Sequence, residues 1–227
     1  MKTRNFLFVV AMILSAIYAN AEGTQFGIKA GVNLANINSN IPDYSSDMRV
    51  GFHVGAGVSI KASNNFAVTI DLLYTQKGAK QTLVGAQTIP GAGSYTYKGE
   101  ETITLSYIEF PILARVTTES GLYFTGGPYV GFLAGFRDEA TVTVTTTVSG
   151  QSPTTTTESG STTDDSGWSA TDFGLKIGLG CKLAGGLDLS GNYSFGFINL
   201  IDVPSNSTYS AHNGVIGFTL GYWFGGK

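Results

Sequence analysis

The chain has 227 residues, of which 31 are glycine, 12% are aromatic and only 13% are charged, and its formal net charge is −3. Without a basic patch, this composition argues against nucleic-acid binding. The single cysteine, Cys181, excludes an internal disulfide framework. Charge is scarce, yet after residue 21 no stretch approaches the ~18 consecutive apolar residues of a membrane-spanning helix.

The N-terminal segment has the composition of a secretory signal peptide. Lys2 and Arg4 form a positive start, residues 6–18 are a short apolar stretch, and Ala19 and Ala21 are small residues at the cleavage positions. We therefore expect a signal peptide over residues 1–21 and a single mature domain over residues 22–227. No cysteine follows Ala21, so no lipoprotein anchor is expected at that site.

The mature chain contains eight segments in which apolar residues occupy every second position. In the first, Phe26, Ile28 and Ala30 alternate with Gly27 and Lys29. Each segment is long enough for the roughly 9–11 residues of a tilted strand that crosses a bilayer. An even number of such segments predicts an all-β fold, an eight-stranded antiparallel transmembrane up-and-down β-barrel. The segments are residues 26–34, 50–61, 66–77, 107–116, 122–136, 173–183, 187–197 and 216–224.

The volume of the two faces indicates which one points inward. The eight apolar faces together hold about forty medium or large side chains, more than the interior of an eight-stranded barrel accommodates. Glycine, serine, threonine and a few long polar residues would fit there. We therefore expect the apolar face to contact lipid in the outer membrane of a Gram-negative bacterium. A soluble β-sandwich, which holds more apolar volume between its two sheets, remains the structural alternative.

The predicted connections alternate between short and long, as they do in outer-membrane barrels. The short ones are residues 62–65, 117–121 and 184–186, and the long ones are residues 39–47, 78–101, 138–167 and 199–211. With both termini in the periplasm, two aromatic girdles are expected. The inner girdle would contain Phe26, Phe66, Phe124 and Phe224, and the outer girdle Tyr74, Phe136, Phe173 and Phe197.

The longest connection is rich in threonine. Residues 143–148 still alternate, so the fifth strand is expected to continue beyond the membrane as a hairpin arm. Residues 153–157 are low in complexity and favour a flexible, solvated tip. Loops on a rigid scaffold often carry recognition, so surface or envelope proteins are candidate partners of these loops.

The inward face carries charges of both signs, which must pair or be hydrated in a narrow lumen. Glu109 and Arg115 share one strand and are too far apart to bond, so each needs a partner on another strand, and Asp71 and Lys176 are candidates. One interpretation is a structural salt-bridge plug; the other is a narrow, weakly anion-preferring pore. The expected lumen charges are Lys29, Lys61, Asp71, Lys77, Glu109, Arg115, Lys176, Lys182 and Asp188.

Four stretches resemble a family of bacterial outer-membrane barrels labelled porin-like or PorT-like: residues 26–34, 72–78, 107–113 and 126–129. The resemblance implies an eight-stranded barrel of a Bacteroidetes-type bacterium and says little about activity. Barrels of this kind tend to end on an aromatic residue read by the barrel-insertion machinery. Here Phe224 takes that place, followed by three more residues.

No enzyme signature is present. The sequence has no Gly-x-Ser-x-Gly elbow and no phosphate-binding loop, and His53 and His212 lack the spacing of metal ligands. We therefore expect no catalytic residue, cofactor or metal. Three functions remain: a structural or surface-interaction barrel acting through its loops, a small-solute pore, or a PorT-like accessory of protein secretion.

Overall fold

A computed structural model describes residues 23–40, 46–90, 93–148, 150–201 and 208–225. The predicted signal peptide lies outside these residues. None of the described segments contains a helix long and apolar enough to cross a membrane. The strands are β1 (Thr24–Ser39), β2 (Arg49–Lys61), β3 (Phe66–Ile89), β4 (Gly93–Thr117), β5 (Leu122–Val148), β6 (Thr154–Thr162), β7 (Thr171–Lys182), β8 (Leu187–Gly196) and β9 (Ala211–Gly225).

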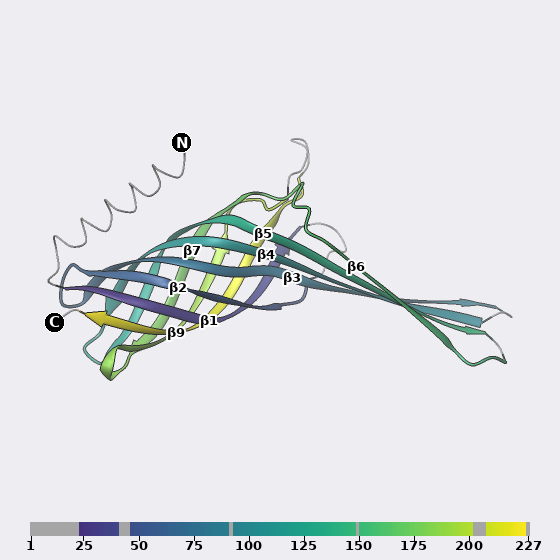
Figure 1. Cartoon of the computed structure of the whole chain (residues 1–227), viewed down its shortest axis with the longest axis horizontal. Coiled ribbons are helices and arrows are strands. Elements are labelled where there is room, and N and C mark those ends of the chain that lie inside the picture. Colours follow the sequence, from purple (N-terminus) through teal and green to yellow (C-terminus); the bar gives the residue numbers. More distant parts are fainter. Residues whose placement is uncertain (1–22, 41–45, 91–92, 149, 202–207, 226–227) are drawn as a thin grey trace.

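Eight of the strands close into one antiparallel ring (Figure 1). The order around the ring is β1-β2-β3-β4-β5-β7-β8-β9, and β9 pairs with β1 to complete it. The β4–β5 and β5–β7 pairings make the ring continuous where β6 branches off. The eight alternating segments of the sequence coincide with these eight strands. The predicted up-and-down barrel is confirmed, and an open two-sheet sandwich is ruled out.

The two faces of the ring differ as the sequence predicts. Large apolar side chains such as Ile28, Leu72 and Ile177 are 51–59% exposed on the outside. Polar side chains such as Asn33, Asp71 and Glu109 are at most 4% exposed on the inside. Several inward glycines leave room for a large neighbour. A Cβ at Gly180, for example, would lie 2.4 Å from the ring of Tyr123.

The short connections all lie at the end of the ring where β1 begins and β9 ends (Figure 1). Residues 62–65 join β2 to β3, residues 118–121 join β4 to β5, and the 3₁₀ turn η1 (Ala184–Gly186) joins β7 to β8. Gly185 and Gly186 have φ of +81° and +93°, a conformation that favours glycine. Phe26 pairs with Phe224, and Phe66 and Phe124 both pair with Val116, so the expected aromatic belt forms at this end.

At the opposite end, the sheet continues past the ring as a four-stranded arm (Figure 1). It consists of the outer halves of β3, β4 and β5, together with β6, which pairs only with β5. Residues 78–101 were expected as a loop; their described parts, residues 78–89 and 93–101, are instead paired strands of β3 and β4. The continuation of the fifth strand is confirmed, whereas the expected flexible tip at residues 153–157 is mostly part of β6. Alternating and β-branched residues favoured strands there, and low complexity did not prevent pairing.

One member of the expected outer girdle faces inward. Phe136 is only 8% exposed and packs with Leu105, Tyr107 and Leu200. The cause is a register shift between β4 and β5: Tyr107 pairs with Leu133 but Ser106 with Gly135, so Ala134 is an extra residue. A β-bulge of this kind reverses the inside–outside alternation beyond it. Phe173 and Phe197 of the same expected girdle do lie outside, with their ring centroids 6.1 Å apart.

The inward placement of Phe136 predicts an asymmetry between two neighbouring phenylalanines. Phe136→Ala should lower the free energy of unfolding by roughly 3–5 kcal/mol, because a cavity remains in a packed cluster. Phe132→Ala, at an outward position, should cost less, about 1.5–3 kcal/mol, because lipid tails fill the space. Urea unfolding in lipid vesicles measures both. An equal or larger loss for Phe132→Ala would contradict the bulge.

Candidate functional site

The densest cluster of ionisable side chains lies in the interior of the ring. Lys77 on β3 forms an ion pair with Glu109 on β4 at 2.7 Å and donates a hydrogen bond to Asp172 on β7 at 2.9 Å. Lys176 on β7 contacts the other oxygen of Glu109. Asp172 also accepts hydrogen bonds from Tyr129 and Asn213. Two cations and two carboxylates from three strands thus neutralise one another.

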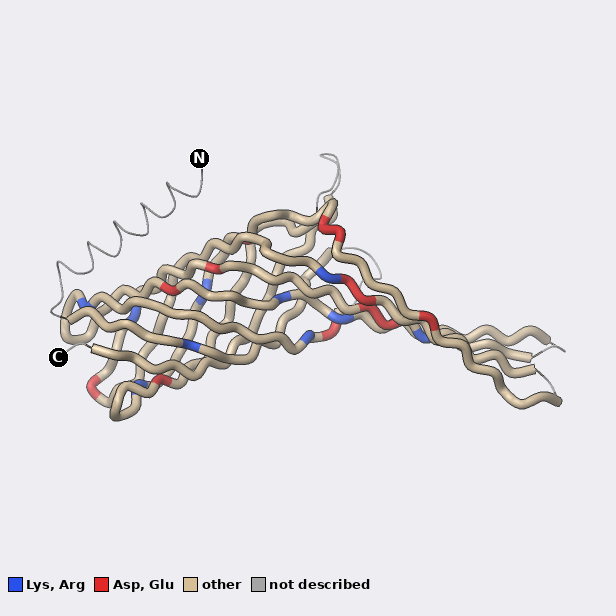
Figure 2. Tube along the Cα trace, in the orientation of Figure 1, with Lys and Arg blue, Asp and Glu red and all other residues tan. Residues whose placement is uncertain are grey.

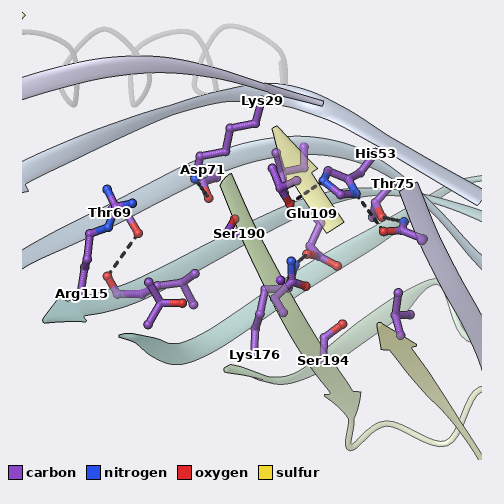
Figure 3. A pocket seen from close by; sticks show the side chains of 18 of the residues that line it. Lys29, His53, Thr69, Asp71, Thr75, Glu109, Arg115, Lys176, Ser190 and Ser194 are labelled. Carbon is purple, nitrogen blue, oxygen red and sulfur yellow. Dashed lines mark hydrogen bonds and ion pairs between the residues drawn. The ribbon is translucent and has the colours of Figure 1, made fainter. Parts of the chain in front are cut away.

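A second ion pair crosses the strand that separates its partners. Lys29 on β1 contacts both carboxylate oxygens of Asp71 on β3, at 2.8 and 2.7 Å, across β2 (Figure 3). The intervening residue is Gly57, and a Cβ there would lie 2.0 Å from the Asp71 carboxylate. Glycine at this position of β2 is therefore what allows the pair to form.

A third ion pair lies closer to the end with the short turns. Arg115 on β4 donates to Asp188 on β8 at 2.5 Å, and the Tyr123 hydroxyl donates to the other oxygen of Asp188 at 2.6 Å. The Arg115 guanidinium lies 3.6 Å from the centroid of the Tyr123 ring, a cation–π distance. Trp223 covers the guanidinium from a second side.

Neutral polar groups lie among these ion pairs (Figure 3). The two ring nitrogens of His53 contact Asn33 at 2.8 Å and Thr219 at 3.0 Å. The Asn33 amide in turn donates to Thr75. His53 therefore has two polar partners in the interior.

The interior charges balance. The four cations Lys29, Lys77, Arg115 and Lys176 each contact at least one of the four carboxylates Asp71, Glu109, Asp172 and Asp188. Glu109 meets Lys176, one of the expected candidates. Arg115 on β4 pairs with Asp188 on β8 and not with Asp71, which pairs with Lys29.

Two expected lumen lysines are not part of this network. Lys61 is exposed at the last position of β2, and Lys182 lies partly exposed at the end of β7, where it donates to Gln25 at 2.6 Å. Both line a cavity of about 250 Å³ at the mouth of the ring. Both lysines follow the inward alternation of their strands, as expected. Because the strands end at these residues, water reaches the side chains.

Several interior residues were missed from the sequence. Asp172 lies one position before the start assigned to the sixth segment, at Phe173, yet it is fully buried. Trp223 is the next inward-pointing position of the eighth segment after Gly221, and it is 4% exposed. Extending the sixth segment by one residue would have found Asp172, and following the alternation to the end of the eighth segment would have found Trp223. Their partners on other strands follow only from the register.

Both ends of the network are bounded by packed side chains. Toward the arm, an apolar layer closes the ring; its buried members are Ile37, Ala79, Leu105, Tyr107, Phe136, Leu200 and Ala211. Within the network, the remaining cavity is about 60 Å³. That is room for a few water molecules. The mouth cavity at the other end is bounded by Arg115 and Tyr123.

The charges of the arm lie in the part nearest the ring, and the outer part of the arm carries none (Figure 2). Glu101 on β4 lies beside Asp138 on β5. Partial burial raises the pKa of Glu101 above its ordinary value. Electrostatic repulsion by Asp138 and a hydrogen bond with it raise this pKa further. Among the described residues, no group of three or more His, Cys, Asp or Glu side chains could hold a metal ion.

Residues 18–202 match the family model described as "outer membrane protein beta-barrel domain". The match covers most of the chain, so the chain belongs to this family. It is therefore a β-barrel protein of the outer membrane of Gram-negative bacteria, with its apolar outer face toward lipid. No curated protein sequence matches the chain.

Among solved structures, the chain is similar to several small outer-membrane proteins. Ail, the attachment invasion locus protein of Yersinia pestis, is 14% identical, with 89% of this chain and 99% of that chain covered and a TM-score of 0.45. Neisserial surface protein A is 13% identical, with coverage of 89% and 100% and a TM-score of 0.37. OprG of Pseudomonas aeruginosa is 10% identical, with coverage of 91% and 98% and a TM-score of 0.30.

The network predicts that removing one carboxylate is costly. Glu109→Gln leaves two buried ammonium groups short of a counter-charge, so the free energy of unfolding should fall by roughly 3–5 kcal/mol. Lys61→Gln is the matched control at the exposed mouth and should change it by no more than about 0.5 kcal/mol. Denaturant unfolding in detergent measures both. Similar effects for the two variants would mean that Glu109 is simply hydrated.

Proposed function

We propose that this protein is a sealed barrel that anchors a rigid β-sheet arm outside the cell and that the arm is its binding element. The observation that carries the proposal is the continuation of three ring strands, joined by β6, into a sheet beyond the barrel. Backbone pairing makes such an arm stiffer than a loop, so it can present a surface at a fixed distance from the membrane.

The interior supports a plug better than a pore. The four cations of the network each contact a carboxylate, and the apolar layer crosses the ring on the side of the arm. An open anion-preferring pore would need cations free to meet a passing ion. Lys61 and Lys182 are the cations at a water-filled mouth, but Arg115 and Tyr123 lie directly behind them.

A role in secretion is the second candidate. The finer resemblance to PorT-like barrels suggests an accessory of protein export across the outer membrane, and the arm would then contact another envelope component. During biogenesis, we expect the insertion machinery to read β9, which carries Phe224 one residue before its end.

The orientation has a direct test. In a Cys181→Ala background, Ser152→Cys at the tip of the arm should be labelled in intact cells by a membrane-impermeant maleimide. Ser63→Cys, in the turn between β2 and β3, should react only after the outer membrane is opened. Heat-modifiable gel migration would verify that both variants fold. Labelling of Ser63→Cys and not Ser152→Cys in intact cells would overturn the external arm.

The sealed interior predicts silent bilayers. The purified protein should produce no stepwise conductance in planar lipid bilayers, because paired charges and the apolar layer leave no continuous water path. A general porin inserted under the same conditions serves as the positive control. Reproducible conductance steps, with anions preferred over cations, would favour the pore instead.

A further inference from the structure

The arm is a single-layer sheet with two chemically different faces. Paired residues of neighbouring strands point to the same side, so the row Leu83–Gly99–Val142 and the row Gly85–Tyr97–Val144 share one face. We call this the apolar face. Its large members are Leu83, Ile89, Tyr95, Tyr97, Val142, Val144 and Val148.

The opposite face consists mostly of threonine and other polar side chains, with Val84 as its one exposed large apolar residue among those described. Thr143 contacts Thr157 at 3.2 Å, and Thr145 contacts Thr155 at 3.0 Å. Lys98 pairs with Glu100 on the same side. Short hydroxyl side chains of this kind are well hydrated, so the threonine face is suited to water.

The apolar face lies beyond the barrel and is open to solvent. Leu83 is 56%, Val142 47% and Tyr97 45% exposed. A sheet that is apolar on one face normally buries that face against a second layer. A contiguous exposed apolar patch of this kind marks an interaction site. The absence of charge from the outer arm points to an apolar partner surface rather than an acidic or basic one (Figure 2).

We propose that a second copy of this chain covers the apolar face, so that two arms pack face to face as a β-sandwich. The proposal rests on the arm being external, as proposed above. All copies stand in one membrane and point the same way, so two arms meet about a two-fold axis along their length. Such an axis places β4 of one copy over β5 of the other at the same height.

At that height the two strands are complementary in size. Gly99 pairs with Val142 and Gly93 pairs with Val148 within one arm. Across the two-fold axis, Val142 and Val148 of one copy therefore face Gly99 and Gly93 of the other. Two packed sheets interdigitate when large side chains of one sheet lie opposite small residues of the other. Tyr97, whose ring lies over Gly85 of its own arm, faces Val144 of the other copy.

The area is sufficient for a stable dimer. Four strands about 4.8 Å apart and roughly ten residues long at ~3.3 Å per residue give about 630 Å² on each arm. Two such faces bury about 1,300 Å² in total, within the ~1,200–2,000 Å² of specific interfaces. Glu158, at the edge of the apolar face on β6, would lie in the solvated rim.

Adjacent residues on opposite faces of β5 provide the test. The full-length protein in detergent should sediment as a concentration-dependent dimer. Val142→Lys places an ammonium group in the interface and should weaken self-association by at least about tenfold, because an unpaired charge is costly to bury. Thr143→Lys, one residue along on the threonine face, should leave it unchanged. Heat-modifiable migration checks that each barrel is folded.

Cross-linking identifies the face directly. With Cys181→Ala as background, Val142→Cys should yield a covalent dimer with a short bismaleimide, and Thr143→Cys should not. A folded protein that stays monomeric, equal cross-linking at both positions, or a different protein bound to the apolar face of a monomer would each overturn the second copy as occupant. None of these results changes the surface labelling of Ser152→Cys, which tests the external arm separately.

Discussion

Charge neutralisation inside a narrow ring is the constraint from which most of this structure follows. With lipid outside, polar side chains must point inward, and there a charge has little water to stabilise it. Four cations and four carboxylates therefore contact one another across strands. These contacts link strands distant in sequence, such as β4 with β8 through Arg115 and Asp188. They hold together strands that are not neighbours in the ring.

The same sheet serves two environments. Inside the membrane, the apolar side of the sheet faces lipid and its polar side faces the lumen. Beyond the membrane, the strands of the arm continue with neither lipid on one side nor a lumen on the other. The β-bulge at Ala134 marks the change, because it turns Phe136 into the apolar layer that closes the ring. Past that layer the sheet is one layer thick, and no second layer formed by the described residues covers its apolar face. The proposed sealing of the lumen and the proposed self-association would thus both follow from one extended sheet.

The sequence is sufficient to predict the barrel because apolar residues alternate in eight segments. The total volume of the apolar side chains, which exceeds the barrel interior, then indicates which face points inward. The sequence also identifies most of the lumen charges, since parity alone assigns Lys29, Lys77 and Glu109 to the interior. Three features lie beyond that reasoning. The pairing of Arg115 with Asp188 depends on a register that one strand cannot reveal, the inward turn of Phe136 depends on one unpaired residue, and the strand at residues 154–162 depends on a partner that stabilises a threonine-rich segment.

A double-mutant cycle on Glu109 and Lys176 tests the central claim, that the lumen charges stabilise one another, most directly. The free energies of unfolding of Glu109→Gln, Lys176→Met and the double variant would be compared with that of the unmodified protein. If the two groups neutralise each other, the double variant loses at least about 1 kcal/mol less than the sum of the single losses. Losses that add up without coupling would mean that water, rather than the partner, stabilises each charge, and the account of lumen charges that stabilise one another would be wrong.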